Sequence, residues 1–379
     1  MLQNYSKQVL ITGSRGFIGL NLSAILGEMK GYEVLHFNRG DTIDELEELV
    51  SRADVIVHLA GINRSDKEDS FREVNIRLTE DLCELVKRKK EATGQATPIV
   101  LASSAQAGNG TVYGESKLAA EKAIQELMTH SGVPAAIFRL PGVFGKWCRP
   151  GYNSVVATFC HRIARGLPIR IDDRAAKLKL VHIDSVVNSL VKCIDRINLD
   201  DALFYSIEPV YVTTVGELAD DIHEFHRNRK VNTVTSVGDG FERCLYSTYV
   251  SYLEVSQISQ ELSIKQDSRG SFVEILRTKY SGQFSYFTCK PGVTRGCHYH
   301  HTKTEKFLIL KGNALFRFRN VVTNETKQFE VSEFDCKVVD TIPGWVHSIT
   351  NIGEDEMTVW LWANEIFDSN NPDTYSGRL

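Results

Sequence analysis

The sequence predicts an α/β domain built on a doubly wound parallel sheet, followed by an all-β barrel. Two observations predict this order of fold classes. Up to about residue 195, short apolar runs alternate with helical patterns, as is typical of βαβ units. From about residue 270, only short strand-like runs remain, separated by Gly, Pro, Asn and Asp, as in barrels and sandwiches. We therefore place the two domains at residues 1–258 and 259–379.

The expected strands of the first domain are rich in β-branched and apolar residues; they cover residues 9–12, 33–37, 55–59 and 99–101. Apolar residues at spacings of three and four predict the intervening helices, around residues 18–29, 43–49 and 74–86. Apolar strands between such helices favour a parallel sheet covered on both faces. Residues 196–269 carry mixed signals, with a helix expected around 215–225. The expected barrel strands include residues 272–276, 307–310 and 357–362.

The composition excludes several classes of function. Hydrophobic residues make up 42% of the chain and charged residues 24%, close to the averages of soluble globular proteins. The net charge of -4 gives no general attraction to a polyanion, so we expect no nucleic-acid partner. No apolar stretch approaches the ~20 residues that span a bilayer, and the eight cysteines form no CxxC pair. We therefore expect a cytoplasmic protein without a membrane span.

A glycine-rich loop follows the first strand and opens the first helix; it reads Gly13-Ser14-Arg15-Gly16-Phe17-Ile18-Gly19. Glycines let the backbone approach a pyrophosphate, and the helix N-terminus offers unpaired N–H groups. The backbone at the end of the third strand is expected to run alongside the same ligand, at Leu59, Ala60 and Gly61. The order of strand, loop and helix therefore predicts a dinucleotide site.

The end of the second strand bears on which dinucleotide binds. This strand ends at Phe37-Asn38-Arg39, without the acidic residue that holds the ribose 2′-hydroxyl of NAD. Arg39, together with Arg15, is instead suited to pair with the 2′-phosphate of NADP. The alternative is that Arg39 is a solvated loop residue. We predict that the cofactor is NADPH.

A tyrosine and a lysine four residues apart, Tyr113 and Lys117, lie at the expected start of a helix. This spacing puts both side chains on one helical face, so that the ammonium group can lower the pKa of the phenol. Ser104 follows the strand at residues 99–101, and its hydroxyl can hydrogen-bond a carbonyl that is being reduced. Ser103 is the alternative for this role. We predict that Tyr113, Lys117 and Ser104 are catalytic.

Together these residues resemble the extended short-chain dehydrogenase/reductase family, which includes nucleotide-sugar reductases, epimerases and dehydratases. The resemblance covers about the first 250 residues and implies a Rossmann-type sheet. It also implies that Tyr113 is the general acid/base, that Lys117 contacts the nicotinamide ribose, and that Ser104 orients the substrate. Residues 139–145 look like a family stretch beside the sugar nucleotide, but Gly142 replaces the usual Asn.

A second cluster of functional residues lies in the β-rich part of the chain. Alternation along a strand puts His298 and His300 on one face, and Glu305 can return on the next strand. His347, further along the chain, can supply a fourth ligand. Three imidazoles and a carboxylate suit a divalent metal, with zinc expected and iron, nickel or manganese as substitutes.

The spacing G-x5-HxH-x4-E-x6-G, followed by G-x2-H-x3-N, resembles the two motifs of the cupins over about the last 110 residues. The resemblance implies a cupin barrel that holds the metal, although Ile342 and Cys336 depart from the second motif. Arg269 and Arg295, each followed by glycine, also resemble deoxysugar 3,5-epimerases. Three charged neighbours of the site are expected to be solvated or to contact a substrate phosphate; they are His301, Lys303 and Lys306.

With residues 144–148 and 150–154, the whole chain resembles the CapF-type family of UDP-2-acetamido-2,6-dideoxy-β-L-arabino-hexos-4-ulose reductases of capsule and O-antigen synthesis. The resemblance implies C3 epimerisation of a UDP-linked 4-keto-6-deoxy-N-acetylhexosamine by the cupin. NADPH-dependent C4 reduction then gives UDP-2-acetamido-2,6-dideoxy-L-talose, on the route to UDP-N-acetyl-L-fucosamine. It also implies a homodimer. Two alternatives stay open: a fusion enzyme for a dTDP- or GDP-sugar, and a non-catalytic NADPH sensor.

Overall fold

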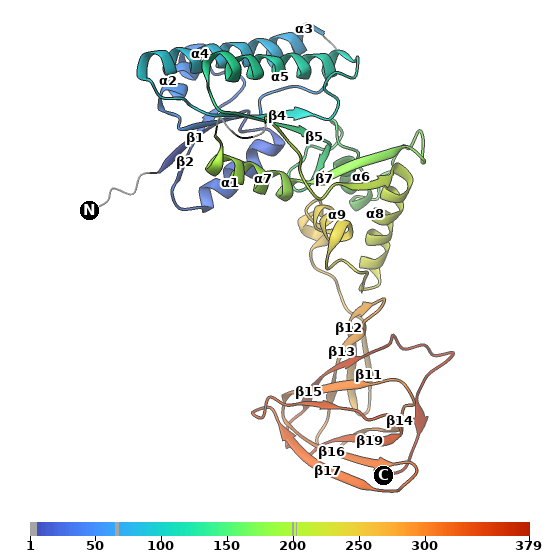
Figure 1. Ribbon diagram of the computed structural model, residues 1–379. Coiled ribbons are helices and arrows are strands. Elements are labelled where there is room, and N and C mark those ends of the chain that lie inside the picture. The colour runs from blue at the N-terminus through green and yellow to red at the C-terminus, as the bar shows by residue number, and fades with distance from the viewer. Residues whose placement is uncertain (1–5, 65–67, 199–200, 202) are drawn as a thin grey trace, which may run out of the picture. The chain divides into compact units, whose positions relative to one another are not determined.

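The computed structural model describes residues 6–64, 68–198, 201 and 203–379. The chain forms two compact units (Figure 1). The first contains residues up to 222 together with 244–253, and the second contains 223–243 together with 254–379. The domain boundary expected between residues 258 and 259 stays a prediction. No described helix is both long enough and apolar enough to cross a membrane.

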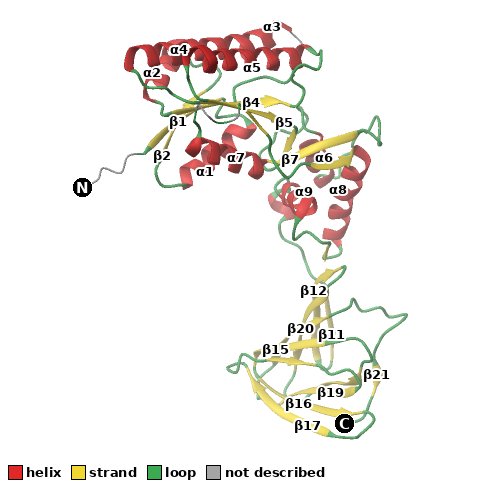
Figure 2. Ribbon diagram, viewed as in Figure 1, coloured by secondary structure: helices red, strands yellow, loops and turns green. Residues whose placement is uncertain are grey.

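A six-stranded parallel sheet is the centre of the first unit (Figure 2). Its strands, in spatial order, are β2 (Tyr32–Phe37), β1 (Lys7–Thr12), β3 (Val55–His58), β4 (Ile99–Ser104), β5 (Ala135–Leu140) and β8 (Phe204–Tyr205). Every pairing within it is parallel. The strands β3 and β4 are buried along their whole length, as expected when helices cover both faces.

Helices pack on both faces of this sheet, which confirms the predicted doubly wound architecture. On one face lie α1 (Phe17–Glu28) and α7 (Ile183–Arg196), and their core residues include Leu22, Leu26 and Leu190. On the other face lie α2 (Ile43–Arg52), α4 (Leu78–Thr93) and α5 (Val112–Ser131), and their core residues include Leu46, Leu82 and Ile124. The apolar spacings of three and four in the sequence therefore mark the buried stripe of each helix.

Shorter elements complete this part of the chain. A short helix α3 (Glu68–Phe71) and a π-helical turn (Arg72–Arg77) precede α4, and α6 (Val155–Ala164) precedes α7. A small sheet contains β6 (Gly142–Phe144), β7 (Lys177–His182) and β9 (Tyr211–Thr214). The helix expected around residues 215–225 is confirmed as the first part of α8 (Val215–Lys230). It is followed by α9 (Gly240–Val250) and by a 3-10 turn (Val255–Gln257).

Two sheets form most of the second unit, which confirms the predicted all-β region; the unit also takes in the end of α8 and the start of α9. One sheet has the order β10-β12-β13-β20-β15-β18, with β11 beside β12, and the other has the order β17-β16-β19-β14-β21. The strands of the first sheet are β10 (Thr233–Val234), β11 (Ile264–Asp267), β12 (Gly270–Thr278), β13 (Gly282–Cys289), β15 (Glu305–Lys311), β18 (Val338–Asp340) and β20 (Met357–Ala363). Those of the second are β14 (Thr294–Tyr299), β16 (Asn313–Asn320), β17 (Thr326–Ser332), β19 (Trp345–Asn351) and β21 (Tyr375–Ser376). Side chains from both sheets form one core, including Phe287, Phe307, Phe316, Ile349 and Val359.

Candidate functional site

The glycine loop lies between β1 and α1, and its shape depends on missing side chains. Gly13 has a φ of +72°, and a Cβ there would lie 2.8 Å from the Cα atom of Ala60. A Cβ on Gly19 would lie 2.4 Å from the carbonyl oxygen of Gly13. The side chains of Phe17 and Ile18 pack against the core, so their backbone N–H groups are what they offer a ligand. This close packing fits a loop that binds a pyrophosphate through its backbone.

We expect Gly19→Ala to weaken binding of the nicotinamide cofactor by roughly 5- to 150-fold, because overpacking of about 1–3 kcal/mol would distort the loop. Gly27→Ala is the matched control: Gly27 lies in the same helix, and a Cβ there meets no atom within 4 Å. Fluorescence titration with NADPH measures both dissociation constants. Equal constants for the two variants would contradict the role given to Gly19.

The end of β2 is tied to the glycine loop by a side chain. Asn38 donates from Nδ2 to the hydroxyl oxygen of Ser14 at 2.9 Å and accepts from the backbone N–H of Arg15 at 2.9 Å. Arg15 and Arg39 are both exposed, and neither forms an ion pair with another described residue. Both guanidinium groups therefore remain available to an anionic ligand beside this loop.

The three residues predicted to be catalytic lie at the junction of β4 and α5. Ser104 is the last residue of β4, and its hydroxyl forms a hydrogen bond with Tyr113 in the first turn of α5. Lys117 is buried one turn further on, and its Nζ atom donates to the carbonyl of Ala102 at 2.8 Å. Burial lowers the pKa of Lys117 to about 8, so the amine is still charged at neutral pH.

The predicted lowering of the Tyr113 pKa by Lys117 is wrong. Burial raises the pKa of Tyr113, and the hydrogen bond with Ser104 only opposes this effect. Lys117 does not lower the pKa of Tyr113, because its ammonium group donates to the backbone of β4 and not to the phenol. A phenol is protonated at neutral pH with or without this shift, so Tyr113 carries the proton that a general acid donates, although the raised pKa makes it a weaker acid.

The structure separates the two candidate serines. Ser103 donates to a carboxylate oxygen of Glu121 at 2.5 Å, and the same carboxylate pairs with Arg139 at 2.6 Å. Ser103 is therefore committed to this network, whereas Ser104 is beside Tyr113. Arg139 belongs to the stretch that resembled a sugar-nucleotide contact, and here it is engaged with Glu121.

The sequence reasoning missed Asn75, which is buried in the π-helical turn. Its side chain accepts from the N–H of Ile62 at 2.8 Å and donates to the carbonyl of Ile62 at 2.9 Å. A Cβ on Gly61 would lie 3.1 Å from the Asn75 Oδ1 atom and 3.6 Å from the Lys117 Nζ atom. Asn75 therefore shapes the predicted cofactor contact at Gly61. Its signal in the sequence is an amide that lies at helical spacing between the apolar residues Phe71 and Leu78.

The four predicted metal ligands converge inside the second unit. His298 lies on β14, His300 follows that strand, Glu305 begins β15 and His347 lies on β19. One ligand atom from each lies within 4.8 Å of all the others. The Oε2 atom of Glu305 is 3.3 Å from the Nε2 atom of His300 and 3.4 Å from that of His347.

The chemistry of this cluster fits a divalent metal. Both ring nitrogens of His347 are buried and make no hydrogen bond to a described residue, which is costly without a further ligand. Burial, with the neighbouring His347, lowers the pKa of His298 to about 4, so this imidazole is a neutral donor at pH 7. Burial acts to raise the pKa of Glu305, but the adjacent imidazoles of His300 and His347 and the ammonium group of Lys303 hold it well below its ordinary value.

Lys303 was expected to be solvated or to contact a substrate phosphate, and the first of these alternatives is wrong. Lys303 is only 8% exposed, and its Nζ atom lies 3.2 Å from the Oε1 atom of Glu305. Lys306 pairs with Asp340, and His301 is exposed. Lys303 therefore forms a buried ion pair with Glu305, and this arrangement depends on the turn before β15.

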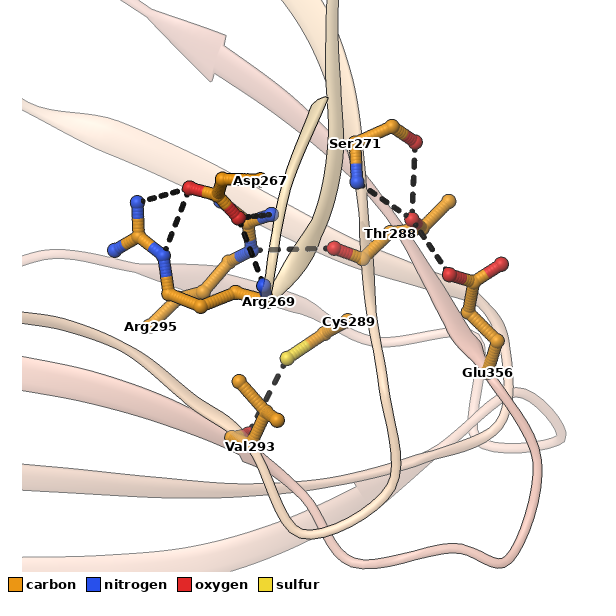
Figure 3. Close-up of polar contacts among 8 residues, drawn as sticks. All are labelled: Asp267, Arg269, Ser271, Thr288, Cys289, Val293, Arg295 and Glu356. Atoms are coloured by element: carbon orange, nitrogen blue, oxygen red, sulfur yellow. Dashed lines mark hydrogen bonds and ion pairs between the residues drawn. The ribbon is translucent and has the colours of Figure 1, made fainter. Parts of the chain in front are cut away.

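A cavity of about 210 Å³ opens beside three of the four predicted ligands, His298, Glu305 and His347. Part of its wall is aromatic and aliphatic, formed by Phe287, Phe307, Phe316, Phe318, Ile349 and Leu361. Arg269 and Arg295 also line it. Asp267 pairs with Arg269 at 2.6 Å, and Arg295 donates from Nε to the carbonyl of Thr288 at 3.1 Å (Figure 3). The cavity therefore combines an apolar wall with cations, as ligand pockets do.

Known protein families match both the N-terminal α/β part and the C-terminal β-rich part of the chain. Residues 9–203 match the NAD dependent epimerase/dehydratase family, and residues 265–375 match the polysaccharide biosynthesis C-terminal domain. These matches define the class, an epimerase/dehydratase-type domain joined to a β-domain of polysaccharide biosynthesis. A Pseudomonas aeruginosa protein named UDP-2-acetamido-2,6-beta-L-arabino-hexul-4-ose reductase is 49% identical over 97% of this chain and 98% of its own. The chain belongs to the family of this reductase, as the CapF-type resemblance predicted.

Solved structures agree with this assignment. The capsular polysaccharide assembling protein CapF from Staphylococcus aureus is 38% identical and has a TM-score of 0.90 over 98% of this chain and 100% of its own. The Bordetella bronchiseptica enzyme WbmF, solved with NADH, is 20% identical and has a TM-score of 0.52 over 60% of this chain and 79% of its own. The second likeness concerns the fold alone.

Proposed function

We propose that this protein converts a UDP-linked 4-keto-6-deoxy-N-acetylhexosamine in two steps. The β-domain epimerises C3, and the N-terminal domain then reduces the C4 ketone with NADPH to UDP-2-acetamido-2,6-dideoxy-L-talose, on the route to UDP-N-acetyl-L-fucosamine. One observation carries this proposal: a single chain holds both the Ser104 and Tyr113 pair and a buried cluster of three histidines and a glutamate. The name of the Pseudomonas aeruginosa relative supports the UDP-sugar substrate and the reductase step. We further propose that the protein is a cytoplasmic homodimer.

In the reduction step, NADPH held by the glycine loop and Lys117 would supply a hydride to C4. Tyr113, whose phenol is protonated at neutral pH, donates a proton to the C4 oxygen. Ser104 donates a hydrogen bond to the same oxygen and orients the ketone. The ammonium group of Lys117 contacts the nicotinamide ribose, and its hydrogen bond to the carbonyl of Ala102 positions it.

In the epimerisation step, the C3 hydrogen is acidic because the neighbouring C4 carbonyl can take up the negative charge. A divalent ion held by His298, His300, Glu305 and His347 would supply Lewis-acid chemistry there. The aromatic side chains in the cavity wall lower the local dielectric, which strengthens the field of nearby charges. Arg295 lines this cavity, with its cation 5.3 Å from the centre of the Phe287 ring.

The test is to incubate the protein with the 4-keto-6-deoxy UDP-sugar and NADPH in deuterated water and to analyse the product by mass spectrometry. A reduced sugar with one solvent deuteron on carbon, at C3, supports both activities. Reduction without deuterium would refute the epimerase step. Absence of any reaction would refute the proposed substrate, and the dTDP- and GDP-linked sugars would be tested next.

Selection of NADPH is expected to depend on Arg39. Loss of a hydrogen-bonded charge pair costs about 1.5–3 kcal/mol, so Arg39→Ala should raise the KM for NADPH by roughly 10- to 150-fold and leave that for NADH unchanged. Arg52→Ala is the matched control, because Arg52 lies in α2 and pairs with Glu33 at 3.2 Å. Steady-state kinetics with both cofactors measure the effect. An equal change for NADH and NADPH would show that Arg39 does not read the 2′-phosphate.

A further inference from the structure

The segment of residues 373–378, here termed the C-terminal clamp, binds directly to the part of the chain that carries the metal ligands. The carboxylate of Asp373 accepts hydrogen bonds from three successive backbone N–H groups, those of His301 at 2.9 Å, Thr302 at 2.7 Å and Lys303 at 2.8 Å. It also accepts from the hydroxyl of Thr302 at 2.9 Å. This one side chain therefore holds the whole turn between His300 and Glu305.

The backbone carbonyl of Asp373 contacts one of the predicted metal ligands, His300. The Nδ1 atom of His300 donates to the carbonyl oxygen of Asp373. Because a carbonyl can only accept, Nδ1 carries the proton and Nε2 presents its lone pair. That Nε2 atom is the one that lies 3.3 Å from Glu305, within the ligand cluster. Such outer hydrogen bonds fix the tautomer and the ring orientation of a metal-binding histidine.

The rest of the clamp contacts the strands of the other histidines. Its strand β21 pairs with β14, so that Ser376 lies opposite His298. The ring of Tyr375 stacks on that of Tyr299, with centroids 5.4 Å apart. A Cβ on Gly377 would lie 2.3 Å from the side chain of Val346, the residue before His347. The clamp therefore touches chain segments that carry or adjoin all three histidines.

We infer that the C-terminal clamp is part of the metal centre and that Asp373 is a positioning residue that sets the affinity for the metal. A tail that only closed the edge of a sheet would need the backbone pairing of β21, but not a carboxylate bound to the ligand turn. By linkage, a metal that binds more tightly when the clamp is closed must in turn favour closure of the clamp. This inference rests on the metal centre of the proposed function.

The first experiment compares zinc affinity in the full-length protein by competition with a chromophoric chelator. Asp373→Asn should raise the zinc dissociation constant by about 10- to 100-fold, the usual effect of losing an outer-shell partner. Asp335→Asn is the matched control: Asp335 accepts from the N–H and the hydroxyl of Ser332, in a turn that contributes no metal ligand. Asp335→Asn should leave the constant unchanged.

The second experiment needs no variant and so does not depend on the folding of one. Hydrogen exchange of the C-terminal peptide of the wild-type protein is measured with zinc and after chelation, and zinc should slow exchange at residues 375–378. Two results would contradict the role given to the clamp without contradicting the metal centre. One is equal zinc affinity of the Asp373 and Asp335 variants, and the other is hydrogen exchange that does not respond to zinc. A wild-type protein that binds no zinc would overturn the metal centre and the clamp together.

Discussion

Tyr113→Phe is expected to lower the rate of NADPH-dependent ketone reduction by about 10²- to 10⁴-fold, the usual contribution of a positioned general acid. The phenol is the general acid of the proposed mechanism, and it is protonated at neutral pH. Phenylalanine keeps the ring and its contact with Phe71, whose centroid lies 6.2 Å away. The loss should therefore fall on kcat and leave NADPH binding intact. Absorbance of NADPH during turnover measures the rate.

Two controls separate this chemical role from a structural one. Tyr205→Phe removes a hydroxyl from edge strand β8, away from the β4 and α5 junction, and should leave the rate unchanged. Exchange of the C3 hydrogen in deuterated water should continue in Tyr113→Phe, because the proposed epimerase site lies in the β-domain. Full turnover by Tyr113→Phe would refute the assigned mechanism.

Removal of the metal is expected to stop C3 exchange while ketone reduction of an already epimerised substrate continues. A Lewis acid contributes several kcal/mol to the stabilisation of developing negative charge, so exchange should slow by ~100-fold or more. Mass spectrometry of substrate incubated in deuterated water, before and after chelation, measures the effect. Addition of zinc to the chelated protein should restore exchange.

Circular dichroism of the chelated protein distinguishes a catalytic from a structural metal. Unchanged spectra with lost exchange would support the catalytic role. Unfolding of the β-domain on chelation would instead mean that the ion contributes folding free energy. Exchange that persists in the metal-free protein would exclude the cluster of His298, His300, Glu305 and His347 from the epimerisation.

Local patterns in the sequence were sufficient for the fold class and for the candidate residues. The alternation of apolar runs and helical spacings predicted the parallel sheet with helices on both faces, because side-chain periodicity of 2 or 3.6 is a local property. The glycine loop and the HxH spacing are local for the same reason. Even the convergence of His347 on the other ligands was predicted, although through resemblance to a family motif.

Only the tertiary structure decided the features that depend on contacts between distant residues. Ser104 was separated from Ser103 by the position of Glu121 on α5. The pKa of Tyr113 depends on burial and on where Lys117 donates its hydrogen bond, and neither follows from the four-residue spacing. Asp373 reaches a turn 70 residues earlier in the chain. The physical reason is common to all three: burial and hydrogen bonding are set by segments that meet only when the chain has folded.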